Sequence, residues 1–228
     1  MTLESTTAVP PPSAAATSTR DYWIPMILFG VLTMGESYLP AEWFPFAYIA
    51  KAVIVTASLL MLRAPLADIR FDARVLLPSV VIGLVVFVLW VGVDKLVPYP
   101  PLGSRTAFDP TTLQGSILPV FLSVRFFGLV IMVPVMEEIF WRSFLLRYLT
   151  DSDFRRLPVG TFSASALMIM LAASGLAHPE WLVAIMASLV YALWIRQSRS
   201  LFGAIVAHAT TNAALGAYVL ATREWQYW

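Results

Sequence analysis

Seven apolar windows, each close to the length of a bilayer crossing, occupy most of this 228-residue chain. A transmembrane helix needs about 20 consecutive apolar residues, because its backbone polar groups find no partners in lipid except one another. Hydrophobic residues make up 59% of the chain and its mean hydropathy is +0.76, well above the values of a soluble domain. The sequence therefore predicts an all-α polytopic membrane helix bundle that forms one domain.

The predicted spans lie near residues 22–38, 43–62, 75–95, 116–136, 161–177, 181–196 and 200–221, and the fourth runs on as a helix to about residue 149. We predict seven transmembrane helices. The alternative is eight, if the fourth segment breaks near Pro134, because an interior proline removes a backbone hydrogen bond. Residues 1–20 are rich in Ser, Thr, Ala and Pro. We expect them to form a disordered tail, followed by the membrane domain at 21–228.

The basic residues are distributed unevenly between the two sides of this predicted bundle. Three loops on one side carry most of them, namely Arg63, Arg70 and Arg74, then Arg147, Arg155 and Arg156, then Arg196 and Arg199. Such an excess marks the cytoplasmic side, so we expect a cytoplasmic N-terminus. A net charge of +1 without a polybasic run argues against nucleic acid as a partner. The absence of cysteine removes thiol nucleophiles and thiolate zinc sites.

Two adjacent carboxylates and an arginine interrupt the fourth apolar segment, at Glu137, Glu138 and Arg142. Ionised groups are costly at membrane depth, so such residues usually have partners and functions. Glu138 and Arg142 are four apart on one helical face, with the acid first, which favours an ion pair. Glu137 is rotated by about 100° around the helix and cannot share that pair equally. The spacing therefore predicts one restrained carboxylate and one free carboxylate.

The only two histidines lie in other apolar segments. His208 and Asn212 share one face of the last span, and His178 ends the fifth span directly before Pro179. If these groups converge with the two carboxylates, one glutamate can act as a general base on a water molecule. His208 and Asn212 can then donate hydrogen bonds to the developing oxyanion. Taken singly, each motif has a structural interpretation: hydrogen bonding between helices for His208 and Asn212, and a helix cap or interface for His178.

Two further basic residues lie within predicted spans, Lys51 and Arg125. Arg125 precedes Glu137 by twelve residues, about 18 Å along a straight helix, which is too far for direct contact. We expect a structural ion pair between Arg125 and either Glu36 or Glu180. For Lys51 we expect the long side chain to extend toward the membrane surface.

The three motifs together resemble those of the CAAX-protease and bacteriocin-processing family of intramembrane endopeptidases, which includes the Ras-converting CAAX endopeptidase. The matches are E-E-x-x-x-R at Glu137, Glu138 and Arg142, the histidine of F-x-x-x-H at His178, and H-x-x-x-N at His208 and Asn212. They follow the family's order on separate helices and cover roughly residues 117–220. The C-terminal stretch and the short length are similar to bacterial CAAX-protease-related proteins that are found with exosortase sorting systems.

This resemblance implies a helical protein with a catalytic cavity inside the bilayer, in a bacterial inner membrane, that cleaves a membrane-associated peptide or protein. It implies that Glu137, supported by Glu138, activates water with His178, while His208 and Asn212 stabilise the oxyanion. It also implies that Arg142 orients the carboxylates, and that an exosortase system is a partner. No cofactor follows from it. One departure is Ser174, which stands where the family motif has phenylalanine.

Three other hypotheses compete with a metal-free peptidase. Two histidines and a glutamate would be enough for an open zinc site, although no H-E-x-x-H motif is present. A non-catalytic membrane scaffold or partner-binding protein would retain the polar cluster for helix packing, and Glu137→Gln would then leave function intact. A small transporter would predict inverted repeats and broken helices in matching halves, and the sequence shows neither.

Overall fold

The computed structural model describes residues 18–103 and 108–227, and the regular structure in this part of the chain is helical. Nearly all of the tail predicted at residues 1–20 lies outside it, and α1 already begins at Arg20. The helices are α1 Arg20–Glu36, α2 Phe44–Met61, α3 Ala73–Leu96, α4 Ile117–Phe127, α5 Val133–Glu138, α6 Leu146–Tyr148, α7 Ala164–Leu176, α8 Trp181–Ser198 and α9 Leu201–Thr222. Each of the seven predicted windows coincides with one helix or one continuous helical run, so the all-α membrane bundle is confirmed.

Five helical segments are long and apolar enough to cross a membrane: Ala41–Met61, Ala73–Leu96, Ile117–Tyr148, Trp181–Ser198 and Leu201–Thr222. The remaining two predicted spans are shorter helices, α1 with 17 residues and α7 with 13 residues. The protein is therefore an integral membrane protein with several spans.

The fourth segment runs without a break from Ile117 to Tyr148, past Pro134. Two π-helical stretches, Gly128–Met132 and Ile139–Leu145, separate α4, α5 and α6 within this run. Pro134 follows the first of them directly, at the second residue of α5. A π turn changes the hydrogen-bond register of the helix, so the missing N–H of the proline falls where the regular ladder is already interrupted. The run therefore stays helical past Pro134, as the prediction of one segment that continues to about residue 149 requires, and the alternative of a break at Pro134 is not seen.

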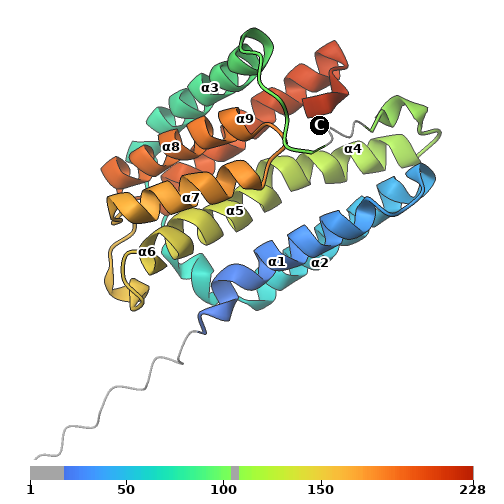
Figure 1. Cartoon of the computed structure of the whole chain (residues 1–228). Coiled ribbons are helices and arrows are strands. Elements are labelled where there is room, and N and C mark those ends of the chain that lie inside the picture. The colour runs from blue at the N-terminus through green and yellow to red at the C-terminus, as the bar shows by residue number, and fades with distance from the viewer. Residues whose placement is uncertain (1–17, 104–107, 228) are drawn as a thin grey trace, which may run out of the picture.

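The α4–α6 run lies in the middle of the bundle (Figure 1). The hairpin of α1 and α2 lies on one side of this run, and α7, α8, α9 and α3 lie on the other. The run supplies several of the most deeply buried apolar side chains, Phe121, Met132, Met136 and Ile139, each at most 2% exposed. Because these residues are shielded on both sides, the carboxylates that follow Met136 also lie in the protein interior.

The elements around the site begin at capping residues that are visible in the sequence. Ser163 accepts a hydrogen bond from the N–H of Ala166 at the start of α7, and Ser200 accepts one from Gly203 at the start of α9. Such caps satisfy the first N–H groups of a helix. Between α8 and α9 lie only Arg199, in the left-handed conformation at φ 54°, and Ser200. This short turn makes α8 and α9 antiparallel neighbours.

Helix α9 packs closely against α3 at Gly83, where a Cβ atom would collide with the carbonyl of Ala207 and the side chain of Thr210. The hydroxyl of Thr211 bonds to the Gly83 carbonyl at this crossing, at 2.8 Å. A glycine in the middle of α3 thus permits the close approach that anchors α9.

One prediction about a charged residue was wrong. Lys51 does not extend to the membrane surface: it is 3% exposed, and its ammonium group pairs with Glu36 and bonds to Thr33 at 3.0 Å. The guanidinium of Arg125 lies over the ring of Tyr48, at 4.4 Å.

Arg147, which the sequence placed among the loop charges, is 4% exposed at the end of the central run. It forms an ion pair with Asp68 at 2.8 Å and donates to the carbonyl of Leu157 at 3.0 Å. Arg147 therefore fastens the end of the helix that carries the carboxylates.

Candidate active site

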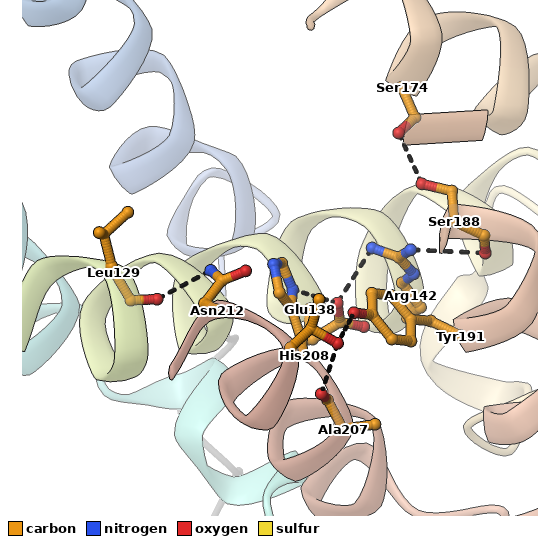
Figure 2. Close-up of polar contacts among 10 residues, drawn as sticks. Leu129, Glu138, Arg142, Ser174, Ser188, Tyr191, Ala207, His208 and Asn212 are labelled. Carbon is orange, nitrogen blue, oxygen red and sulfur yellow. Dashed lines mark hydrogen bonds and ion pairs between the residues drawn. The ribbon is translucent and has the colours of Figure 1, made fainter. Parts of the chain in front are cut away.

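Glu138 is the centre of a buried polar cluster between the central run, α8 and α9 (Figure 2). Its Oε1 atom accepts hydrogen bonds from Nη1 of Arg142 at 3.0 Å and from Nδ1 of His208 at 2.9 Å. Glu138 is 0% exposed and Arg142 is 2% exposed. The ion pair predicted from the four-residue spacing is thus present, and it recruits the histidine of α9.

The two hydrogen bonds define which nitrogen of His208 carries a hydrogen. A carboxylate paired with a guanidinium is ionised and can only accept, so Nδ1 of His208 donates to it. Nε2 is then the ring atom available to a substrate. The second oxygen of Glu138, Oε2, is buried and accepts no hydrogen bond from the described residues, so it remains an available acceptor within the site.

Glu137 has a different environment from its neighbour. It is 9% exposed, and its carboxylate makes no hydrogen bond or ion pair within residues 18–103 and 108–227. The two adjacent glutamates therefore differ in the way that the helical geometry predicted: one is held by two cationic or polar donors, and the other is not.

Asn212 projects from the same face of α9 as His208 and also reaches the central run. Its amide Nδ2 donates to the carbonyl of Leu129 at 2.8 Å (Figure 2). Leu129 belongs to the first π-helical stretch. One Nδ2 hydrogen is used in this bond and the second is left for another acceptor.

His178 lies at the end of α7, and no recorded contact joins it directly to Glu137, Glu138 or His208. Its Nδ1 atom is 2.8 Å from the carbonyl of Ser174. A carbonyl only accepts, so Nδ1 carries the hydrogen, and Nε2 of a neutral ring can accept a hydrogen bond from water. The ring also contacts Trp90 edge to face, at 6.4 Å between centroids.

Ser174, where the family motif has phenylalanine, links His178 to the rest of the cluster. Its hydroxyl is 2.6 Å from that of Ser188 on α8, and the Ser188 carbonyl lies 3.5 Å from Nη2 of Arg142. Both serines are at most 5% exposed. The substitution thus replaces an apolar contact by a hydrogen bond between helices. Three of the six motif residues are therefore in direct contact: Glu138, Arg142 and His208. Glu137 and Asn212 are their neighbours on the same helices. His178 is connected to Arg142 through hydrogen bonds of Ser174 and Ser188.

Sequence reasoning missed Tyr191 and Thr211, both 3% exposed beside His208. The Tyr191 hydroxyl donates to Oγ1 of Thr211 at 2.7 Å, and its ring stacks on the His208 imidazole. A signal was available, because tyrosines of membrane helices favour the interfaces, whereas Tyr191 lies in the middle of a span and needs a partner for its hydroxyl.

The structure provides no evident zinc ligand set. Within the described ranges, no group of three His, Asp or Glu side chains lies close enough together to hold a metal ion. His178 is bonded through Nδ1 to the carbonyl of Ser174 and His208 through Nδ1 to the carboxylate of Glu138.

The fold and the cluster define a polytopic membrane protein with a buried carboxylate–imidazole site. Residues 119–214 match the family model described as Rce1-like, type II CAAX prenyl endopeptidase, so this part of the chain is similar to the CAAX-protease family. The match spans the central run, α7, α8 and most of α9, and it includes all six motif residues. The match supports a CAAX-type peptidase of the membrane. No curated protein and no solved structure matches the chain significantly.

Proposed function

We propose that this protein is an intramembrane endopeptidase in which Glu137 activates the water that attacks a peptide bond. The observation that carries the proposal is the contrast between the two glutamates: Glu138 is tied to Arg142 and His208, whereas Glu137 beside it makes no hydrogen bond with the described residues. A general base must be able to take a proton, and a carboxylate without a cationic partner is the better acceptor.

In the proposed reaction, Glu137 takes a proton from a water molecule as the water oxygen bonds to the substrate carbonyl carbon. Nε2 of His178 accepts a hydrogen bond from the same water. Nε2 of a protonated His208 and the second amide hydrogen of Asn212 stabilise the oxyanion. The C–N bond then breaks, and Glu137 returns its proton to the leaving amine. Glu138 takes no part in proton transfer.

Arg142 and Glu138 have a supporting role in this scheme. Because Glu138 accepts from Nδ1 of His208, it directs Nε2 toward the substrate and stabilises the positive charge of the imidazolium. Arg142 holds the Glu138 carboxylate in position through the ion pair. The ion pair is therefore a scaffold for the oxyanion site, and the free carboxylate performs the chemistry.

The substrate that we propose is a membrane-associated peptide or protein, cut near its membrane anchor. We further propose a bacterial inner-membrane location with a cytoplasmic N-terminus, supported by the excess of arginine in three loops. The resemblance to proteins found with exosortase systems adds proteins sorted by such a system as candidate substrates.

A comparison of membrane-protein termini in producing cells tests the proposal. Cells with the wild-type protein should contain new C-termini that are missing with Glu137→Gln at equal protein level. The matched control is Glu42→Gln, which changes an exposed glutamate of the Ala41–Trp43 turn and should leave processing intact. Retained processing with Glu137→Gln would contradict the proposal and favour a non-catalytic scaffold.

A further inference from the structure

Tyr191 on α8 touches both of the groups that hold Glu138. Its ring stacks on the His208 imidazole, with 5.2 Å between centroids and an interplanar angle of 22°. The guanidinium of Arg142 lies over the same ring, 5.4 Å from its centroid. Figure 2 shows the three side chains together around Glu138.

The position of the Tyr191 ring is itself restrained at its far end. The phenolic hydroxyl donates to Oγ1 of Thr211 at 2.7 Å. The Thr211 hydroxyl lies 2.8 Å from the carbonyl of Gly83 on α3 and 3.1 Å from that of Ala207 on α9. Tyr191 is therefore anchored at the tight α3–α9 crossing, in addition to its own helix.

We propose that Tyr191 is a positioning residue for His208: its anchored ring sets the orientation of the imidazole, so that Nδ1 faces Glu138 and Nε2 faces the substrate. This inference rests on the proposed function, because the orientation of the His208 ring matters there for binding the oxyanion.

The physical need for such a restraint follows from the histidine side chain. The χ2 torsion of histidine is broad and roughly two-fold, so the ring alone has no single preferred orientation. Among the described residues the His208 ring makes one hydrogen bond, to Glu138, and a single bond allows the ring to swing about the line of that bond. A flat aromatic surface parallel to the imidazole removes this freedom, because tilting the ring breaks the stack.

The hydroxyl is the feature that distinguishes this role from simple packing. A phenylalanine would fill the same volume without burying a polar group at mid-membrane depth. The chain instead carries a tyrosine whose hydroxyl is fully engaged with Thr211, and the hydroxyl of Thr211 in turn reaches the backbone of two helices. The hydrogen bond to Thr211 therefore restrains the orientation of the Tyr191 ring. Without it, only the packing of neighbouring side chains would restrain the ring.

The test is NMR of the full chain in detergent micelles with ¹⁵N-labelled histidine. The chain contains two histidines, so two imidazole signals are expected, and His178→Gln assigns them. The measured quantity is the exchange rate with water of the Nδ1 proton of His208. Loss of the stack in Tyr191→Leu should raise this rate roughly two- to tenfold. Loss of the anchor in Tyr191→Phe should raise it at least about twofold.

The control is Tyr48→Leu, which removes a similarly buried tyrosine, 2% exposed, from α2, and α2 lies on the opposite side of the central run (Figure 1). It should leave the exchange of the His208 proton unchanged. An unchanged rate in Tyr191→Leu would overturn the proposal. If Tyr191→Leu does not accumulate, the test uses Tyr191→Phe instead. A wild-type exchange rate of the His208 Nδ1 proton in that variant would then overturn the proposal.

The NMR measurement needs no substrate, so its outcome is independent of whether the protein is a peptidase. With a cleavable substrate, Tyr191→Phe should lower kcat while KM stays unchanged, because His208 acts on the oxyanion and not on the bound substrate. Retained activity in Glu137→Gln would overturn the proposed function and leave the orientation of His208 by Tyr191 standing. A wild-type exchange rate of the His208 Nδ1 proton in both Tyr191 variants would overturn the orientation of His208 by Tyr191 and leave the proposed peptidase function standing.

Discussion

Replacing Arg142 by methionine should destabilise the protein severely, because it leaves the Glu138 carboxylate charged and almost without compensation. Glu138 is 0% exposed and Arg142 is 2% exposed, and Oε1 of Glu138 would keep only its bond to His208. Removing one partner of a buried ion pair lowers the free energy of unfolding by about 3–5 kcal/mol. This corresponds to a roughly 10²- to 10⁴-fold larger unfolding constant.

A double-mutant cycle separates this buried-charge effect from the loss of packing. Glu138→Gln alone leaves the guanidinium buried without its carboxylate and should cost a similar amount. The double variant Glu138→Gln/Arg142→Met leaves neither charge. Its loss of unfolding free energy should therefore be smaller than the sum of the losses in the two single variants by about 2–3 kcal/mol. The unfolding free energies are to be measured by SDS titration of the protein in detergent micelles.

The exposed ion pair between Arg156 and Asp153 provides the matched control. It also joins neighbouring turns of one chain segment, but its side chains are 83% and 51% exposed. The corresponding cycle, with Arg156→Met and Asp153→Asn, should give a coupling of about 0–1 kcal/mol. If the costs of Glu138→Gln and Arg142→Met add to within about 0.5 kcal/mol, the buried pair does not stabilise the site as we describe.

Two further predictions concern the elements around the site. Gly83→Ala should lower the melting temperature, because its Cβ would collide with α9, whereas Gly30→Ala meets open space and should be neutral or slightly stabilising. At the C-terminal end of α3, the hydrogen bond from Lys95 lowers the pKa of Glu224 below its usual value, so the folded state binds this proton more weakly than the unfolded state does. The link between Lys95 and Glu224 is therefore fully present at neutral pH and is lost as the pH falls through the lowered pKa. Hydrogen exchange of residues 223–227 would report this loss as a lower protection factor in acid, relative to the unfolded-chain rate at the same pH. Glu224→Gln should remove this pH dependence, and a wild-type protein without it would contradict the assignment.

The spans of this protein were predictable because the membrane constrains the sequence strongly. Each apolar window had to become a helix, and the windows at 181–196 and 200–221 left too few residues between them for anything but a tight turn. The continuity of the central run to about residue 149 was predicted, but its two changes of helical register were not predictable. The π-helical stretches have no periodic signal in the sequence, so Pro134 suggested a break where the structure has a register change.

The site was partly predictable for the same physical reasons. The pair of Glu138 and Arg142 follows from helical spacing alone. The bond from His208 to Glu138, rather than to Glu137, depends on how α9 packs against the central run, and no local pattern encodes it. Lys51 shows the limit of local reasoning: its partner Glu36 lies on the preceding helix, so the ion pair forms only after the two helices associate.

The most direct test of the central claim is the kinetics of purified Glu137→Gln on a cleaved peptide, measured together with its thermal stability. Because Glu137 makes no hydrogen bond with the described residues, the variant should keep the wild-type melting temperature. The account predicts that kcat falls by about 10²- to 10⁴-fold with peptide binding unchanged. A folded Glu137→Gln protein that cleaves at the wild-type rate would contradict the role of Glu137 as the base.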